Sequence, residues 1–308
     1  QNKINDMNIE SIKKIVLYFM SKHALRKYYN RLKRTNKITN LTQAQKQEIQ
    51  AYYMDNYSVN VNTKWHEILY SISGVYRVDY MPFDVYGQLL ERFSPFAYKK
   101  VLDDKVLYDW LLPDVKLPNR LYYDGSLEKL IKSYKGNFVI EEKVVCCDNL
   151  RNLNPSSCNT LRMHTWRNRK ENKIEFVSAF LRVGRKDSLI DNGFAGGIAI
   201  PVRVDGALSK SGCTLKTYKR YEQSDTGITF KGYKIQQFDE MVQVVCDAHH
   251  NLPHFDLIGW DVTINNKNEV VVIEFNPDPD MRLDQLIFLD NCLLDKKKKI
   301  YKVLFKHD

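Results

Sequence analysis

The sequence predicts an α+β protein in which a helical N-terminal region precedes a core of antiparallel strands. Residues 8–56 place apolar side chains at spacings of three and four, which is the helical period. Later β-branched runs are separated by polar turn residues, most clearly between Ile258 and Pro277. We therefore expect a helical region over residues 1–100 and a strand-rich core over residues 101–308.

The length, cysteine content and net charge of the chain limit the class of protein to which it can belong. The 308 residues are enough to bury a substantial core, and no apolar run is long enough to span a bilayer. Six cysteines without zinc-finger spacing are typical of a reducing compartment, so we expect a cytoplasmic protein. The formal net charge of +10 favours anionic partners, namely nucleotide, acidic glycan, anionic lipid or nucleic acid. No nucleic-acid-binding motif accompanies this charge, so we expect no nucleic acid partner.

The N-terminal region, residues 8–56, is amphipathic and basic, and Thr42 marks the start of a second helix within it. A basic amphipathic helix can lie on a membrane surface. It can also pack on its own protein while its lysines stay in water, and this simpler arrangement is the one we favour.

The stretch from Ile258 to Pro277 carries the strongest chemical signal. Asp261 lies on its first predicted strand, while Glu274 and Asn276 lie two apart on the second, so those two side chains point the same way. Two carboxylates and an amide oxygen form a hard site that suits Mg²⁺ with nucleotide phosphates. Acids near hairpins are usually solvated, but Glu274 follows four apolar residues, where an unpaired carboxylate would be costly to bury.

At these residues the chain resembles a known family. An Asp on one strand, a Glu thirteen positions later and an Asn two beyond resemble the metal-binding end of ATP-grasp enzymes. The phrases GlyTrpAsp and GluPheAsn are most similar to the sugar-transfer associated ATP-grasp proteins, a branch linked to bacterial surface polysaccharide synthesis. The resemblance implies an ATP-grasp fold, ATP and Mg²⁺ as cofactors, and Asp261, Glu274 and Asn276 as metal ligands.

The same resemblance implies a nucleotide site. Lys105 opens a predicted helix and matches the family's lysine that reaches the phosphates, although a solvated helix lysine would look the same. Residues 137–144 predict a strand that is similar to the family's hinge for adenine and ribose. The hinge residues that the resemblance assigns to the nucleotide are Glu141, Glu142, Lys143 and Val145, and the alternative is an exposed strand end.

A substrate side is implied further along the chain. Arg162 and Arg182 lie in predicted strands, and their planar donor forks suit a carboxylate or a phosphoryl group. The phrase around Asp191, Asn192, Gly196 and Gly197 is similar to a family phrase at the substrate side of the cleft. Glycines there could bring backbone amides close to an anion, whereas the simpler alternative is a hairpin turn.

One segment of the family pattern has no counterpart. ATP-grasp proteins carry a small lobe with a glycine-rich loop that closes over the triphosphate, and it would fall between Gly125 and Ser126. Either the protein has lost this lobe or the sequence as given omits it, and the family-like phrases on both sides favour the omission. A real loss would put catalysis in doubt.

The resemblance implies ATP-dependent carboxylate-amine or carboxylate-thiol ligation through an acyl-phosphate. The expected product joins an amino acid or amine to a sugar acid of a surface polysaccharide. The alternatives are a non-catalytic nucleotide- or glycan-binding module and a phosphotransferase acting on a sugar. The lysines at 296–299 are most simply a solvated helix face, although they could favour a membrane-linked glycan.

Overall fold

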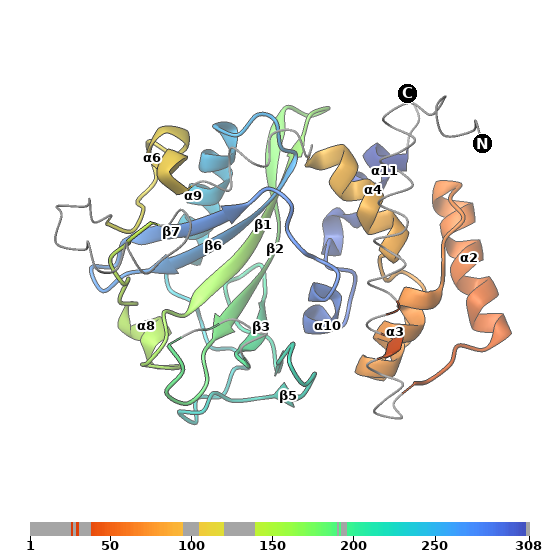
Figure 1. Cartoon of the computed structure of the whole chain (residues 1–308), viewed down its shortest axis with the longest axis horizontal. Coiled ribbons are helices and arrows are strands. Elements are labelled where there is room, and N and C mark those ends of the chain that lie inside the picture. The colour runs from red at the N-terminus through yellow and green to blue at the C-terminus, as the bar shows by residue number, and fades with distance from the viewer. Residues whose placement is uncertain are drawn as a thin grey trace, which may run out of the picture. The chain divides into compact units, whose positions relative to one another are not determined.

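The computed structural model describes residues 26, 29–30, 38–94, 105–119, 139–189, 191 and 196–305. Its backbone divides into two compact units, one of residues 1–93 with 280–308 and one of residues 94–279 (Figure 1). This division differs from the predicted one because the last stretch of the chain groups with the N-terminal helices. The prediction of domains at 1–100 and 101–308 stays a prediction, and the predicted lobe position at 125–126 lies outside the described residues.

The first unit is helical within the described ranges, as predicted. The predicted helix start at Thr42 is confirmed, because Thr42 Oγ1 accepts from Gln45 N at 3.1 Å and Gln45 Oε1 accepts from Thr42 N at 2.9 Å. Residues 8–25 of the predicted first helix lie outside the described part. The elements are α2 (Gln43–Tyr57), α3 (Lys64–Ser73), α4 (Phe83–Phe93), α10 (Asp284–Phe288), η2 (Leu294–Lys296) and α11 (Lys297–Phe305).

Hydrogen bonds from buried amides join the last stretch of this unit to the turn before α4. Gln285 binds both backbone groups of Met81, accepting from its N at 2.5 Å and donating to its O at 3.1 Å. Asn291 donates to Asp79 O at 2.8 Å and to Tyr301 Oη at 3.1 Å. These bonds fix the chain between α10 and α11 against the turn before α4.

Within the described ranges, no helix combines the length and apolar character needed to cross a membrane.

The second unit is built on a seven-stranded sheet in which every neighbouring pair is antiparallel. The strand order is β5-β4-β3-β2-β1-β6-β7. This confirms the α+β class and the predicted hairpin of β6 and β7. The strands are β1 (Thr160–Asn168), β2 (Lys173–Val183), β3 (Ile198–Val202), β4 (Gly212–Cys213), β5 (Arg220–Tyr221), β6 (Leu257–Ile264) and β7 (Val270–Asn276).

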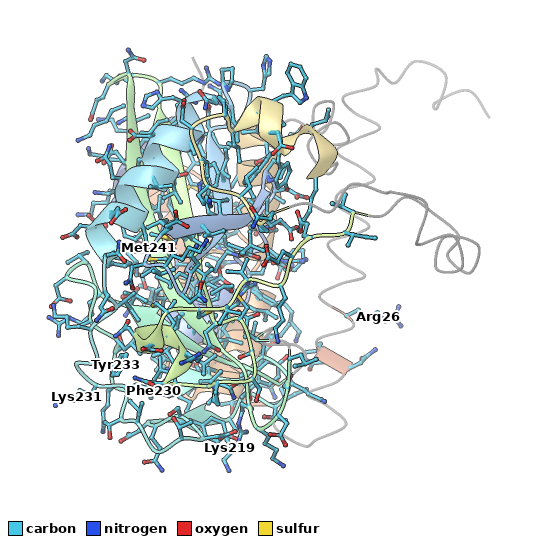
Figure 2. The ribbon with its side chains drawn as sticks, turned by 90° about the vertical axis from the view of Figure 1, so that its left-hand side faces the viewer. Arg26, Lys219, Phe230, Lys231, Tyr233 and Met241 are labelled. Carbon is cyan, nitrogen blue, oxygen red and sulfur yellow. The ribbon has the colours of Figure 1, made fainter. Side chains whose placement is uncertain are left out.

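The hydrophobic core of this unit lies between one face of the sheet and helix α9 (Phe238–His250), as Figure 1 shows. Met241 of α9 and Phe230 are fully buried in this core, while Lys219 and Lys231 are exposed at the edge of the molecule (Figure 2). Period-2 alternation places the core residues on one face, including Leu161, Met163, Leu181, Trp260, Val262 and Phe275. The opposite face is therefore available for polar side chains.

A β-bulge in β7 decides which residues reach that opposite face. Asp261 pairs with Glu274, but the next residue, Val262, pairs with Val272, so Ile273 is an extra residue on β7. In a strand without a bulge, Glu274 and Val272 would share a face, because they are two residues apart. With it, Val272 enters the core at 0% exposure and Glu274 turns to the polar face.

Two predicted elements differ in the structure. Residues 139–144, the described part of the predicted hinge strand, form no regular strand, because Glu142 N donates to Asn119 O at 2.7 Å rather than to a ladder partner. The predicted helix near Lys105 is present only as η1 (Lys105–Leu107) and α6 (Tyr108–Leu111). A further short helix, α8 (Asp148–Arg151), follows the hinge segment.

Candidate active site

The polar face of the sheet brings most of the predicted site residues together. Directly paired residues on neighbouring strands point to the same face. Arg162 of β1 pairs with Asp261 of β6, which pairs in turn with Glu274 of β7. Two pairs further along, Gly259 lies opposite Asn276, and on the other side of β1 Thr160 lies opposite Arg182.

Five of these residues form what we call the arginine cluster: Thr160, Arg162, Arg182, Asp191 and Asp261. Asp261 accepts two hydrogen bonds from Arg162, from Nε to Oδ1 at 2.5 Å and from Nη2 to Oδ2 at 3.1 Å. Arg182 Nη2 lies 2.9 Å from the same Oδ2. Both carboxylate oxygens of Asp261 are thus engaged by guanidinium groups, and its residue exposure is only 6%.

The cluster is electrostatically balanced. Burial raises the pKa of Asp261, but the charges and hydrogen bonds of Arg162 and Arg182 lower it more, so the net pKa lies below the ordinary value. Burial lowers the pKa of Arg182, and the nearby Asp261 and Asp191 carboxylates raise it above its ordinary value. The ion pairs therefore favour the charged forms of Asp261 and Arg182.

Asp191, predicted to contact substrate, instead contacts protein in this arrangement. Its Oδ2 accepts from Thr160 N at 3.0 Å and from Thr160 Oγ1 at 2.5 Å, and it lies 3.6 Å from Arg182 Nε. Burial raises the pKa of Asp191, and the Arg182 charge only partly offsets this. Thr160 Oγ1 also accepts from Arg182 Nε and Nη2 at 3.0 and 2.6 Å, so Thr160 connects the two charges.

Thr160 was not anticipated from sequence, although its position two residues before Arg162 on one strand was a usable signal.

The glycines near Asp191 have a packing role. A Cβ at Gly197 would lie 2.1 Å from Asp191 O, which only glycine avoids, and Gly196 has φ +112°. Asn192 lies outside the described residues, and the substrate role of this group stays a prediction.

The lysine cluster consists of Lys105, Glu141 and Glu274. Lys105 Nζ lies 3.3 Å from Glu141 Oε2, 3.8 Å from Glu274 Oε2 and 3.5 Å from Ile273 O. Lys105 comes from η1 and Glu141 from the hinge segment, so three separate parts of the chain meet at β7. The Glu274 side chain is 41% exposed, which contrasts with 9% for the Asp261 side chain.

The residues beside this cluster fit a hard cation. Asn276 Nδ2 is buried and has no hydrogen-bond partner in the described part of the protein; this donor suits a phosphate oxygen, whereas Oδ1 of the same amide is the atom that can bind a cation. Glu274 and Asn276 supply oxygen donors of the type that Mg²⁺ prefers. Asp261 fits less directly, because its oxygens are shared with two arginines. Among the described residues, no group of three or more His, Cys, Asp or Glu side chains is suited to a metal ion.

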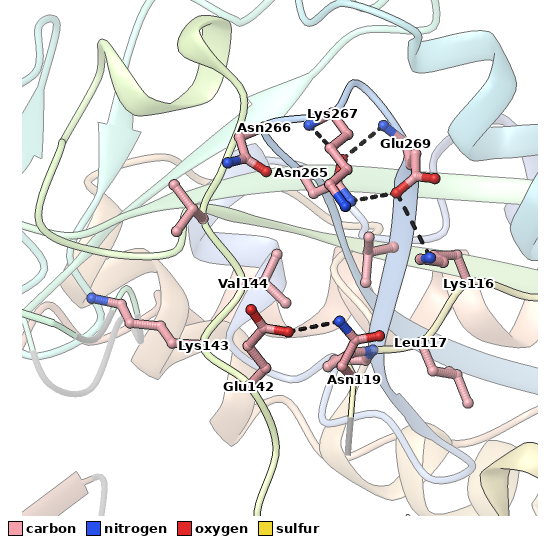
Figure 3. Close-up of a pocket in the computed structure, with 13 residues that line it drawn as sticks. Lys116, Leu117, Asn119, Glu142, Lys143, Val144, Asn265, Asn266, Lys267 and Glu269 are labelled. Atoms are coloured by element: carbon pink, nitrogen blue, oxygen red, sulfur yellow. Dashed lines mark hydrogen bonds and ion pairs between the residues drawn. The ribbon is translucent and has the colours of Figure 1, made fainter. Parts of the chain in front are cut away.

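A pocket lies at the hairpin end of the same unit (Figure 3). Three segments line it, residues 116–119, 142–145 and 265–271, around a solvent-open space of about 550 Å³. Glu142, Lys143 and Val145 belong to its wall, whereas Glu141 turns toward Lys105. Its apolar lining consists of Leu117, Pro118, Val144, Val145 and Val271. The contributions of residues 116–119 and 265–269 were not predicted from the sequence.

Short polar contacts hold the pocket wall in place. Asn119 Nδ2 donates to Glu142 Oε2 at 2.6 Å, and Asn265 Nδ2 donates to Glu269 Oε2 at 2.8 Å (Figure 3). Val271 pairs with Thr263, so the bulge places Val271 on the same face as Glu274. Their partners on β6, Thr263 and Asp261, are two residues apart, so the two residues of β7 lie about 7 Å apart along the sheet. An extended nucleoside triphosphate can bridge this distance.

Comparison with known proteins identifies the family of this chain. The family model for sugar-transfer associated ATP-grasp proteins matches residues 126–302, which is more than half of the chain. The chain therefore belongs to the sugar-transfer associated ATP-grasp family. Lys105 and the N-terminal helices lie outside the matched range. No curated protein sequence matches the chain.

Several solved structures are similar to this chain at low identity. The macrocyclase MdnB from Microcystis aeruginosa MRC is 11% identical with a TM-score of 0.36, over 70% of this chain and 60% of that one. N5-carboxyaminoimidazole ribonucleotide synthetase from Thermotoga maritima is 14% identical with a TM-score of 0.34, over 60% and 44%. The ATP-grasp ligase PsnB, complexed with minimal precursor, Mg and ADP, is 10% identical with a TM-score of 0.38, over 72% and 68%. The chain thus spans less than two thirds of the first two of these proteins.

Proposed function

We propose that this protein is an ATP-dependent carboxylate-amine ligase. The observation that carries the proposal is the placement of Lys105 beside Glu274, on the same face of the sheet as Val271 of a pocket with an apolar lining. A nucleotide could place its base in the pocket and its phosphates near Lys105. Membership of the ATP-grasp family supports the same assignment.

Each nucleotide contact has a candidate. The pocket residues Glu142, Lys143 and Val145 would hold the base and ribose, with Glu141 at the turn toward the phosphates. Lys105 would pair with a phosphate, since it is a cation already shared between two carboxylates. Asp261, Glu274 and Asn276 would hold Mg²⁺, which neutralises phosphate charge when bound.

Arg162 and Arg182 would contact the reacting group. Each uses Nε and Nη2 for its bonds within the arginine cluster, and no hydrogen bond to the Nη1 group of either is found among the described residues. The remaining nitrogen of each guanidinium can therefore donate to a phosphoryl oxygen or a tetrahedral intermediate. Asp191, Asn192, Gly196 and Gly197 would form the substrate side.

The reaction would proceed in two steps. The donor carboxylate takes the terminal phosphoryl group of ATP to form an acyl-phosphate, and an amine then displaces the phosphate to form an amide. We propose an amino acid or amine and a sugar acid of a surface polysaccharide as substrates, with the reaction in the cytoplasm and the acceptor free or membrane-linked.

A second candidate, a nucleotide- or glycan-binding module without turnover, is favoured by one observation. Both arginines are held by Asp261, so each must keep a strong internal ion pair while contacting a substrate. This candidate predicts nucleotide binding with no release of ADP.

The test measures ADP and phosphate release with amines and sugar acids, together with Mg²⁺-dependent nucleotide binding by calorimetry. Glu274→Gln should abolish turnover and leave the fold intact, while Glu240→Gln, at an exposed carboxylate of α9 on the other face of the sheet, should leave turnover unchanged and is the control. Transfer of phosphate to a sugar hydroxyl would indicate a phosphotransferase. Full activity of Glu274→Gln would remove the proposed site.

A further inference from the structure

Two cysteines outside the proposed chemistry are in direct contact. Cys146 Sγ and Cys158 Sγ lie 3.6 Å apart, while neither takes part in a disulfide. Cys146 is buried at 3% exposure, and Cys158 is partly exposed. The buried sulfur also contacts Thr263 Oγ1 at 3.2 Å and Asn159 O at 3.5 Å.

The pair joins two segments that serve the candidate site. Cys146 directly follows Val145 of the pocket wall, and Cys147 N is fixed to β6 by a bond to Ile264 O at 2.8 Å. Cys158 lies two residues before Thr160, which holds Arg182 and Asp191 in the arginine cluster. A covalent bond between the sulfurs would therefore connect the pocket wall to the start of β1.

We propose that Cys146 and Cys158 form a reversible disulfide by exchange with a small disulfide of the glutathione class. The sulfurs are already in contact, and a bond requires them to close to about 2.05 Å. Cys158 is the thiol that an external disulfide can reach, and Cys146 is positioned to resolve the mixed disulfide. Formation of this bond does not rest on the proposed ligase function.

The exchange is chemically balanced. Cys158 sulfur attacks the external disulfide, its proton passes to Cys146 or to solvent, and one small thiolate leaves. Cys146 thiolate then attacks the Cys158 sulfur of the mixed disulfide and expels the second small thiolate. Two protein thiols are oxidised by two electrons, and one small disulfide is reduced to two thiols.

The surroundings favour ionisation of the inner thiol. A hydrogen bond from the Cys158 thiol lowers the pKa of Cys146, burial opposes this, and the Thr263 hydroxyl lowers it further. The same contact, together with burial, raises the pKa of Cys158, so it is the position of its sulfur against Cys146 that sets it apart. Cys246 is also partly exposed, but no second cysteine sulfur contacts it among the described residues, which makes it the control position.

The experiment incubates the reduced full chain with excess oxidised glutathione and follows it by intact mass and by peptide mapping after alkylation. We expect the loss of two hydrogen atoms, a linked pair of peptides containing Cys146 and Cys158, and full reversal by dithiothreitol. A stable glutathione adduct on Cys158 with no internal bond would overturn the proposal, as would a bond between other cysteines.

Two variants complete the test. Cys158→Ser should abolish the internal bond, and Cys246→Ser should leave its formation unchanged. The oxidised wild type should show a higher Tm than the reduced wild type, whereas Cys158→Ser should show no such shift, because the cross-link restricts only the unfolded chain. Equal Tm shifts in wild type and Cys158→Ser would contradict the assignment, and the wild-type peptide map stands even if a variant fails to fold.

Discussion

The arginine cluster and the lysine cluster lie on the same face of one sheet, yet they handle charge in opposite ways. In the arginine cluster the Asp261 carboxylate is almost fully buried and both of its oxygens are bound by guanidinium groups. In the lysine cluster Glu274 is half exposed, and its nearest cation, Lys105 Nζ, is 3.8 Å away and shared with Glu141. Asp261 and Glu274 nevertheless lie directly opposite each other on β6 and β7.

The difference teaches which charges serve the fold and which remain available for a ligand. A buried ion pair with well-formed hydrogen bonds is costly to break, since removal of one partner leaves the other unpaired. An exposed and loosely paired carboxylate contributes little to stability, so it can exchange its partner at small cost. We infer that the ion pairs of the arginine cluster fix the two guanidinium groups in place for a ligand, and that the lysine cluster is where a bound ligand can replace an existing partner.

The largest expected effect is a loss of stability on changing Asp261, the buried carboxylate of the arginine cluster. Asp261→Asn keeps the side-chain shape but removes the charge that two buried arginines share, so we expect a loss of about 3 kcal/mol in the free energy of unfolding. Glu274→Gln should change the same quantity by less than about 0.5 kcal/mol. Urea unfolding of both variants measures the difference, and equal losses would show that the two clusters do not differ as described.

The next effect concerns acid. His164 is buried two residues from Arg162; burial, with the Arg162 charge adding to it, lowers its pKa from 6.5 to about 3. Between these two pKa values, His164 is therefore protonated in the unfolded chain and neutral in the folded chain. This contribution to stability is complete above pH 6.5 and is lost as the pH falls toward 3, at about 1.4 kcal/mol per pH unit.

His164→Gln should remove that share of the slope between pH 6 and pH 4 in urea unfolding. His250→Gln, at an exposed histidine of α9, is the control and should leave the slope as it is in the wild type. An unchanged slope in His164→Gln would mean that the imidazole beside the arginine cluster is not held neutral.

A third change sharpens the comparison on the lysine side. Lys105→Met removes the cation between Glu141 and Glu274, so we expect nucleotide affinity to fall about tenfold, because a phosphate loses one charge-assisted bond. Calorimetric titration with ADP and Mg²⁺ measures this, and Lys231→Met at an exposed lysine (Figure 2) is the control. Unchanged affinity would separate Lys105 from the phosphate site while leaving its ion pairs intact.

The smallest expected effect tests the connection within the arginine cluster. Thr160→Val removes the hydroxyl between Asp191 and Arg182, and a loss of about 1.5 kcal/mol should follow because buried charges lose a hydrogen-bond partner. Thr160→Ser keeps the hydroxyl and should retain most of the stability. Equal unfolding free energies for Val and the wild type would show that Asp191 and Arg182 need no intermediary.

Much of the fold follows from the sequence, because local patterns determine it. The β-branched runs around Asn265–Asn268 predicted the β6–β7 hairpin, and the cap at Thr42 was also expected. Each of these depends on residues close in the chain. The predicted hinge strand at residues 137–144 was wrong for its described part, where Glu142 N bonds to Asn119 O, a distant partner that no local pattern indicates.

The candidate site was predictable in its residue types but not in its pairings. Asp261, Glu274, Arg162 and Arg182 were predicted as site residues from the sequence, and the structure places their side chains on one face of the sheet. That Asp261 binds both arginines depends on strand register, which is set by the whole sheet. Thr160 and the pocket segment 116–119 were missed for the same reason, since their roles arise only from contacts distant in sequence.

The extra residue Ile273 gives the hairpin an uneven tolerance to change. A substitution there alters one side chain, whereas a one-residue deletion would restore strict alternation between the two strands. Val272 would then directly precede Glu274, so it would keep its place in the core while Val271 stays on the Glu274 face. An inserted residue would instead require a second bulge to keep these faces, so this strand tolerates the loss of one residue better than the gain of one.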